Sequence, residues 1–308
     1  PPDSESGGAR EMTPGHLCPL PLQSTTTVRY LLKLIFILTI IGLTPGISHA
    51  QILGTNNLEE MTDSIKKDFD YGPFFGLYKD NYFTVGSAIG QKPSALNSDV
   101  KFQISLSIRL TDATLPWHTY LYLFYTQLTF WNVFQNSMPM RDMNFNPGIG
   151  WTKPFFSKDR YIGKMTLIVE HESNGKDGDD SRSWNRVSLA GSAVVTDWLM
   201  VHAKFWIPII DSMNNKDILD YCGLFRVGFT LTSSDKRWQG NMSFVKRKGN
   251  MFNWNTVAEV SWKVSEKANV NLFAQYYNGY GENLLDYNRF HSRLRVGLVF
   301  KPHLFSDY

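Results

Sequence analysis

A histidine and a serine two positions apart, His171 and Ser173, end a predicted β-strand at residues 161–173, YIGKMTLIVEHES. Successive strand side chains point to opposite faces, so both lie at the end of an apolar row: Tyr161, Gly163, Met165, Leu167, Val169, His171 and Ser173. The other face carries Lys164, Thr166, Glu170 and Glu172, with Ile162 as an apolar exception. The row would be core in a water-soluble β-protein. In a membrane barrel it would face lipid, which suggests lipid as the substrate.

An asparagine on the following strand completes a possible catalytic set. From Ser181 onward, Asn185 shares the apolar face with Val187 and Leu189, and a hairpin would place Asn185 beside His171. Ser173 would then attack an acyl carbonyl, His171 would take its proton, and Asn185 would fix the imidazole tautomer. The alternative is that these are polar residues at a strand boundary, which are common there.

The loop NGKDGDDSR between the two strands is rich in carboxylates. Asp177, Asp179 and Asp180 are hard oxygen ligands of the kind that calcium takes, although their spacing is not that of an EF-hand. A solvated acidic turn explains the composition equally well. A cation here would supply the electrophile that a tetrahedral oxyanion near Ser173 needs.

Gln127 is a further polar residue on a predicted lipid-facing row, together with Leu121, Leu123 and Tyr125. A buried amide in hydrocarbon is costly unless it is paired, so we expect a role in protein–protein contact within the membrane. The alternative is a side chain at the membrane interface that reaches the headgroups.

The composition of the 308 residues fits one large β-domain or two smaller ones. A net charge of +3 gives no indication of nucleic-acid binding, and we expect none. Aromatic residues make up 14% of the chain, as expected if they form belts at the membrane boundaries. Cys18 lies in a segment that we expect to be removed, which leaves Cys222 alone and excludes a disulfide framework in the mature protein.

The N-terminal residues 1–50 are interpreted as an extension and a cleaved export signal. Arg29 and Lys33 precede an apolar run at 34–43, and Ser48-His49-Ala50 provides small residues for cleavage before residue 51. A single transmembrane anchor is the alternative, but the run is shorter than the ~20 residues that a spanning helix needs. Residues 51–80 show no clean period and are predicted to form a periplasmic segment before a barrel at 81–308.

Period-2 alternation follows along the rest of the chain, clearest at residues 100–110. We predict an all-β fold, a single transmembrane antiparallel β-barrel of about twelve strands: 81–89, 99–111, 118–131, 143–152, 160–173, 182–193, 197–208, 220–232, 236–247, 252–264, 267–278 and 291–301. The connections alternate between short and long, as periplasmic turns and outer loops do, which favours a bacterial outer membrane and places the loop after Ser173 outside. A soluble sandwich is the alternative; the polar face argues against it, because a packed core has no use for two complementary faces repeated over twelve strands.

Two motifs resemble one family closely: His171-Glu172-Ser173-Asn174-Gly175 and Ser181-Arg182-Ser183-Trp184-Asn185-Arg186. They resemble the active-site motif of outer-membrane phospholipase A, the calcium-dependent barrel enzyme of Gram-negative outer membranes. Three further segments agree, namely KFQISL at 101–106, YTQ with the following tryptophan at 125–131, and GYGENLLDYN at 279–288.

The resemblance implies A1 and A2 hydrolysis of phospholipids and lysophospholipids by Ser173, His171 and Asn185, and activation of a dormant monomer by homodimerisation. It implies a calcium ion held by Ser181 and the main-chain oxygen of Lys176, with Ser137 reaching in from the partner. Gln127 would lie at the dimer interface. The chain departs from the family at Gly178, where a calcium-linked aspartate is usual; Asp177 and Asp179 flank it.

Two other functions remain open on the sequence alone. One is a passive porin-like channel, although charged inward residues such as Lys164, Glu170, Arg226, Glu259 and Lys263 would plug a barrel of this size. The other is a lipid-binding or adhesion barrel that has lost catalysis, against which the intact Ser173, His171 and Asn185 set argues. The sequence specifies neither headgroup preference nor the trigger of dimerisation.

Overall fold

The computed structural model describes residues 69–70, 74–111, 115–157, 160–209, 213–265 and 270–302. The predicted export signal and residues 51–68 lie outside the described residues. Within the described residues no helix is long and apolar enough to cross a membrane.

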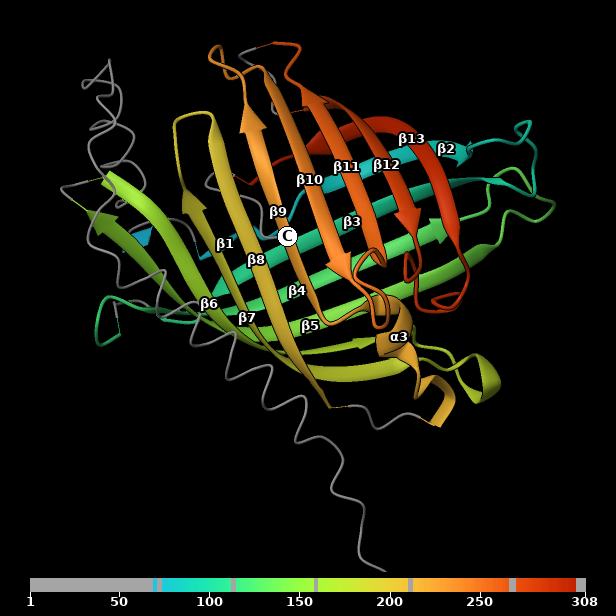
Figure 1. Cartoon of the computed structure of the whole chain (residues 1–308), viewed down its shortest axis with the longest axis horizontal. Coiled ribbons are helices and arrows are strands. Elements are labelled where there is room, and N and C mark those ends of the chain that lie inside the picture. The colour runs from blue at the N-terminus through green and yellow to red at the C-terminus, as the bar shows by residue number, and fades with distance from the viewer. Residues whose placement is uncertain are drawn as a thin grey trace, which may run out of the picture. The chain divides into compact units, whose positions relative to one another are not determined.

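The described residues form one antiparallel sheet of thirteen strands that closes into a barrel. The sheet order is β1-β3-β2-β13-β12-β11-β10-β9-β8-β7-β6-β5-β4, and the β3–β4 pairing closes it (Figure 1). The strands are β1 (Phe75–Leu77), β2 (Asn81–Ala88), β3 (Ser98–Arg109), β4 (Tyr120–Trp131), β5 (Met140–Ser157), β6 (Arg160–Ser173), β7 (Ser183–Val194), β8 (Leu199–Ile209), β9 (Phe225–Thr232), β10 (Trp238–Lys246), β11 (Trp254–Trp262), β12 (Asn271–Gly279) and β13 (His291–Phe300).

β1 and β2 lie end to end along β3 and together occupy one strand position, so the thirteen strands form a barrel of twelve strand positions. β1 pairs with residues 106–108 of β3, and β2 pairs with residues 98–103. Between them, Asn81 accepts from the Ser105 amide and donates to the Ser105 carbonyl, at 2.5 and 3.0 Å. Residues 75–77, which we expected to precede the barrel, thus pair within it. The prediction of a twelve-stranded transmembrane barrel is confirmed.

The alternation along β6 places apolar side chains outside and polar ones in the lumen. Met165, Leu167 and Val169 are exposed, whereas Thr166 and Glu170 are buried. One part of the predicted row is wrong, because Tyr161 is buried inside and packs in a cluster with Phe69 and Tyr120, while Ile162 is exposed.

The reason for this change of face is a bulge at the start of β6. Phe156 pairs with Tyr161 and Phe155 pairs with Gly163, so Ile162 is left as an extra residue. Gly163 has a φ of +149°. A bulge residue shifts every earlier side chain to the opposite face, which moves Tyr161 inward and Ile162 outward.

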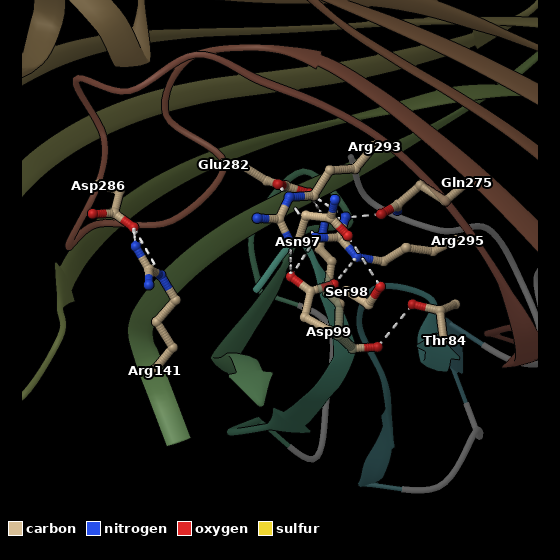
Figure 2. A network of polar contacts seen from close by, with 11 residues as sticks. Thr84, Asn97, Ser98, Asp99, Arg141, Gln275, Glu282, Asp286, Arg293 and Arg295 are labelled. Carbon is tan, nitrogen blue, oxygen red and sulfur yellow. Dashed lines mark hydrogen bonds and ion pairs between the residues drawn. The ribbon is translucent and has the colours of Figure 1, made fainter. Parts of the chain in front are cut away.

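Ion pairs fill the lumen. Glu170 contacts Lys204 at 2.6 Å and Arg186 at 3.1 Å, and Glu172 contacts Arg186 at 2.8 Å. Further round the wall, Arg295 contacts Asp99 at 2.7 Å and Glu282 at 2.6 Å (Figure 2). Charges are retained inside a barrel when each has a counter-charge.

The loop between β12 and β13, residues 280–290, contributes to this filling. Its Leu284 and Tyr287 side chains are buried. Its backbone amide at Leu284 donates to Asn144 of β5 at 3.1 Å, and its Asp286 pairs with Arg141 (Figure 2). Burial alone would raise the pKa of Glu282, but Arg295 and Lys101 lower that pKa to about 2, so the carboxylate stays ionised. The loop 280–290 therefore occupies part of the barrel interior.

The connections differ in length at the two ends, as the sequence predicts. The connections after β2, β4, β6, β8, β10 and β12 lie at one end, among them the loop 174–182, and those after β3, β5, β7, β9 and β11 lie at the other. The two longest, after β8 and β12, lie at the first end, and the two shortest, after β5 and β7, at the second. The β3–β4 connection, residues 110–119, is longer than the predicted pattern of compact turns. The predicted strand at 220–232 begins too early, because residues 218–222 form the short helix α3 (Ile218–Cys222) and β9 starts at Phe225 (Figure 1). Ile218 is fully buried against Trp184 and Leu284, and this packing favours a helical turn over a strand.

Candidate active site

The register of β6 and β7 brings His171 and Asn185 together. They are direct cross-strand partners, and Nδ1 of His171 lies 2.8 Å from Oδ1 of Asn185. Because an amide oxygen only accepts, Nδ1 must carry the hydrogen, which leaves Nε2 with a free lone pair. This is the tautomer that a general base needs.

Ser173 lies two residues farther along the same face of β6. The neighbouring outward residue Val169 is 61% exposed, while the alternate residues Glu170 and Glu172 make lumen ion pairs. By alternation His171 and Ser173 look outward, and both are half-buried. A nucleophile and a base thus share the face that meets lipid.

The strand on the other side of β6 leaves a gap in the ladder at His171, and a side chain fills it. The register between Phe145↔Ser173 and Gly148↔Glu170 puts Pro147 opposite His171, and proline has no N–H to donate. Nδ2 of Asn146 instead donates to the His171 carbonyl at 2.8 Å. The sequence prediction missed Asn146; the proline inside a strand pattern was the available signal.

The loop 174–182 is closed by one buried asparagine. Asn174 Oδ1 accepts from the Arg182 amide at 2.9 Å, and its Nδ2 donates to the Asp180 carbonyl at 2.9 Å. The next residue, Gly175, has a φ of +63°, and a Cβ there would come within 3.0 Å of the Phe145 ring. A glycine is therefore favoured directly after Ser173 and Asn174.

A second brace comes from the 3-10 helix at residues 213–215. Within the described residues the β7–β8 pairing ends at Asn185↔Ile209. Asn215, which is 0% exposed, accepts from the Ser183 amide at 3.3 Å and donates to the Ser183 carbonyl at 3.0 Å. Its neighbour Asn214 donates to the Gly178 carbonyl at 2.7 Å. The Asn215 amide thus holds the backbone of Ser183, which is the register partner of Ser173. No local feature of the sequence indicates this contact.

The predicted calcium ligands are not all brought together. Asp177 and Asp179 are exposed, and the described residues contain no group of three acidic, histidine or cysteine side chains placed around one metal position. Ser181 and Lys176 lie on the loop that follows Ser173, and Nζ of Lys176 donates to the Arg141 carbonyl at 3.1 Å. Ser137 is exposed on the neighbouring loop between β4 and β5, with a φ of +64°.

Gln127 lies on the same row of the outer wall as Ser173. It pairs with Phe145 of β5, which pairs with Ser173 of β6. Its Oε1 accepts from the Tyr125 hydroxyl at 3.0 Å and its Nε2 donates to Thr129 at 3.3 Å. The amide is thus satisfied within its own strand, so its polarity alone does not require a partner subunit.

Comparison with known proteins places the chain among lipid-degrading barrels. The family model described as Phospholipase A1 matches residues 77–300. Phospholipase A1 of Salmonella typhimurium is 33% identical over 217 residues, and that of Klebsiella pneumoniae is 32% identical over 215. Each alignment covers 67% of this chain and 71% of the relative.

Solved structures agree. Outer membrane phospholipase A from Escherichia coli superposes with a TM-score of 0.65 at 25% identity, covering 74% of this chain and 98% of that one. The Salmonella typhi outer membrane phospholipase, crystallised as a dimer with bound calcium, gives a TM-score of 0.66 at 25% identity, with coverage of 77% and 96%.

Proposed function

The chain belongs to the outer-membrane phospholipase A1 family, and from this premise we propose that Ser173, His171 and Asn185 hydrolyse the acyl esters of phospholipids and lysophospholipids in the bacterial outer membrane. The observation that carries the proposal is the 2.8 Å bond between His171 and Asn185 on the lipid-facing row that ends in Ser173. A porin-like channel is disfavoured by the lumen, which ion pairs and the loop 280–290 fill.

Acylation proceeds from the outer face. The Ser173 Oγ attacks the ester carbonyl carbon while Nε2 of His171 takes the hydroxyl proton. Asn185 holds the Nδ1 hydrogen throughout, so the imidazolium keeps its orientation. Asn185 carries no charge, so it stabilises the imidazolium less than a carboxylate does. His171 then protonates the departing glycerol oxygen, and the acyl group remains on Ser173.

Deacylation repeats the same steps with water. His171 takes a proton from water, whose oxygen attacks the acyl carbonyl. The proton then passes from His171 to Ser173 Oγ as the fatty acid leaves. Substrate chains can stay in the bilayer, because the exposed apolar side chains of β5 and β6 surround the site.

The proposed cofactor is Ca²⁺, which is bound in the Salmonella typhi neighbour. Two oxygens of the loop after Ser173 fit a hard cation, the Lys176 carbonyl and the Ser181 hydroxyl. Neither accepts a hydrogen bond within the described part of the chain. When bound, the cation would stabilise the developing oxyanion.

These two oxygens fall short of the six to eight that calcium takes, which fits a site completed by a second copy. The Salmonella typhi neighbour is a dimer. In a homodimer of this chain through the wall around Gln127, Ser137 of the partner would supply a further oxygen. Asp177 and Asp179, exposed on the same loop, would add negative charge near the cation.

Fatty-acid release from phospholipid micelles tests the proposal. The refolded protein, Ser173→Ala and a control, Ser157→Ala at the far end of β5, are compared with and without calcium. We expect release from wild type and Ser157→Ala only with calcium, and none above background from Ser173→Ala. Hydrolysis by a folded Ser173→Ala would remove the nucleophile assignment, and full activity after chelation would remove the cation.

A further inference from the structure

A cavity of about 240 Å³ lies inside the barrel, away from the outward-facing Ser173. Its lining includes cations of several strands, among them Lys79, Arg186, Lys204 and Arg226. The proposed reaction uses none of these side chains.

The cations around this cavity are not all matched by an ion-pair partner among the described residues. Glu170 and Glu172 make ion pairs with Arg186 and Lys204. Within the described residues Arg226 makes no ion pair, and its Nε is shielded from solvent without a hydrogen-bond partner. Glu259, the other carboxylate on this side of the cavity, accepts instead from Gln275 at 2.7 Å and from Asn241 at 2.9 Å.

Arg226 also faces another cation across the sheet. It is the direct register partner of Lys204 on β8, and like charges in such positions repel each other. Lys204 has Glu170 at 2.6 Å. Arg226 cannot relieve the repulsion by losing its proton, because a guanidinium stays charged in proteins.

A second, independent feature lies beside Arg226. Ser243 on β10 lines the same cavity and is only 4% exposed. Its hydroxyl has no hydrogen-bond partner among the described residues. Arg226 pairs with Val245, two positions along from Ser243, so the two side chains are diagonal neighbours on the lumen face. The Nε of Arg226 and the hydroxyl of Ser243 are thus both without a hydrogen-bond partner among the described residues at one wall of the cavity.

We propose that this cavity binds a small inorganic anion, held by the Arg226 guanidinium and the Ser243 hydroxyl with Lys79 nearby. The anion offsets the charge of Arg226, which has no ion-pair partner among the described residues, and gives a hydrogen-bond acceptor to the shielded Nε of Arg226 and hydroxyl of Ser243. The site is structural, so its ligand stabilises the folded barrel and does not enter hydrolysis.

Bromide is the probe, because it scatters X-rays anomalously. Crystals of the full chain grown in bromide should show an anomalous peak in the cavity beside Arg226, and crystals of Arg226→Gln should not. A wild-type map with bromide only at the protein surface, an adventitious ion only, would overturn the proposal. The wild-type map alone tests the proposal, so the test holds even if Arg226→Gln does not fold.

Equilibrium unfolding gives a test in solution. Above the dissociation constant, each tenfold rise in bromide should shift the wild-type folding equilibrium about tenfold toward the folded barrel. Arg226→Gln should lose this response and Ser243→Ala should weaken it. Lys248→Gln, which removes an exposed cation, should respond as wild type does. Equal responses of wild type and Arg226→Gln would show that bromide acts as a general salt, contrary to the proposal.

Discussion

The two faces of the β6–β7 hairpin carry polar residues for opposite purposes, one position apart in sequence. On the inner face, Glu170 contacts Lys204 and Arg186 and accepts from Ser188 at 2.6 Å. On the outer face, His171 and Asn185 are half-exposed and bonded to each other. The comparison teaches that strand alternation lets a rigid ionic scaffold lie directly behind a reactive pair, without their side chains meeting.

The largest expected effect is on the outer face. His171→Ala removes the proposed base, so hydrolysis should fall about 10⁴-fold or more. Its unfolding free energy should change by only about 1 kcal/mol, because one half-exposed hydrogen bond is lost. Fatty-acid release and urea unfolding are measured on the same preparation. If His171→Ala were strongly destabilised, the outer face would also carry stability, and the proposed difference between the two faces would be wrong.

The reverse pattern is expected one residue earlier. Glu170→Gln leaves Arg186 and Lys204 without their shared buried counter-charge, so the unfolding free energy should fall by about 3–5 kcal/mol. Asp197→Asn, which removes the exposed pair with Arg160, should cost about 1 kcal/mol or less. The folded fraction of Glu170→Gln should keep most of its activity. Inactivation of a fully folded Glu170→Gln would show that the inner face takes part in catalysis.

A smaller loss is expected for the orienting residue. Asn185→Ala frees the imidazole to rotate, so kcat should drop about 10- to 100-fold while the barrel stays folded. Val187→Ala, the next outward residue on β7, is the matched control and should keep kcat. Turnover is compared at saturating micellar substrate. Equal kcat in wild type and Asn185→Ala would mean that another group holds the ring.

The smallest effect on kcat is expected for Asn215, whose side chain holds the Ser183 backbone. Asn215→Ala removes two hydrogen bonds to the Ser183 backbone, which should lower kcat several-fold with KM unchanged and cost about 1–3 kcal/mol of stability. Asn250→Ala, in the β10–β11 loop at the same end of the barrel, serves as the control. A change in stability alone would make Asn215 a structural residue without influence on the site.

The sequence predicts the barrel because period-2 alternation is a local signal. Rows such as residues 100–110 of β3 show it, and the twelve predicted strands correspond to β2–β13. β1 was missed because three residues are too few to show a period. The bulge at Gly163 and the helix α3 were missed because packing of Tyr161 and Ile218 in the interior decides them.

The candidate site divides in the same way. His171 and Asn185 could be placed on one face, and as partners, from strand parity and the length of the loop between them. The contacts of Asn146 and Asn215 join residues 25 and 32 positions apart in the sequence. No local sequence pattern predicts such contacts. The lumen pairs of Glu170 with Lys204, and of Arg295 with Asp99, likewise depend on how the strands close into a ring.

Covalent labelling tests most directly whether the outward Ser173 is the nucleophile. A long-chain alkylsulfonyl fluoride reacts with an activated serine, whose Oγ displaces fluoride from sulfur. Peptide mass spectrometry of the calcium-loaded wild type in micelles should find one adduct, on Ser173, and His171→Ala should remain unlabelled. Loss of activity with the adduct on another residue, or an active enzyme that stays unmodified at Ser173, would contradict the assignment.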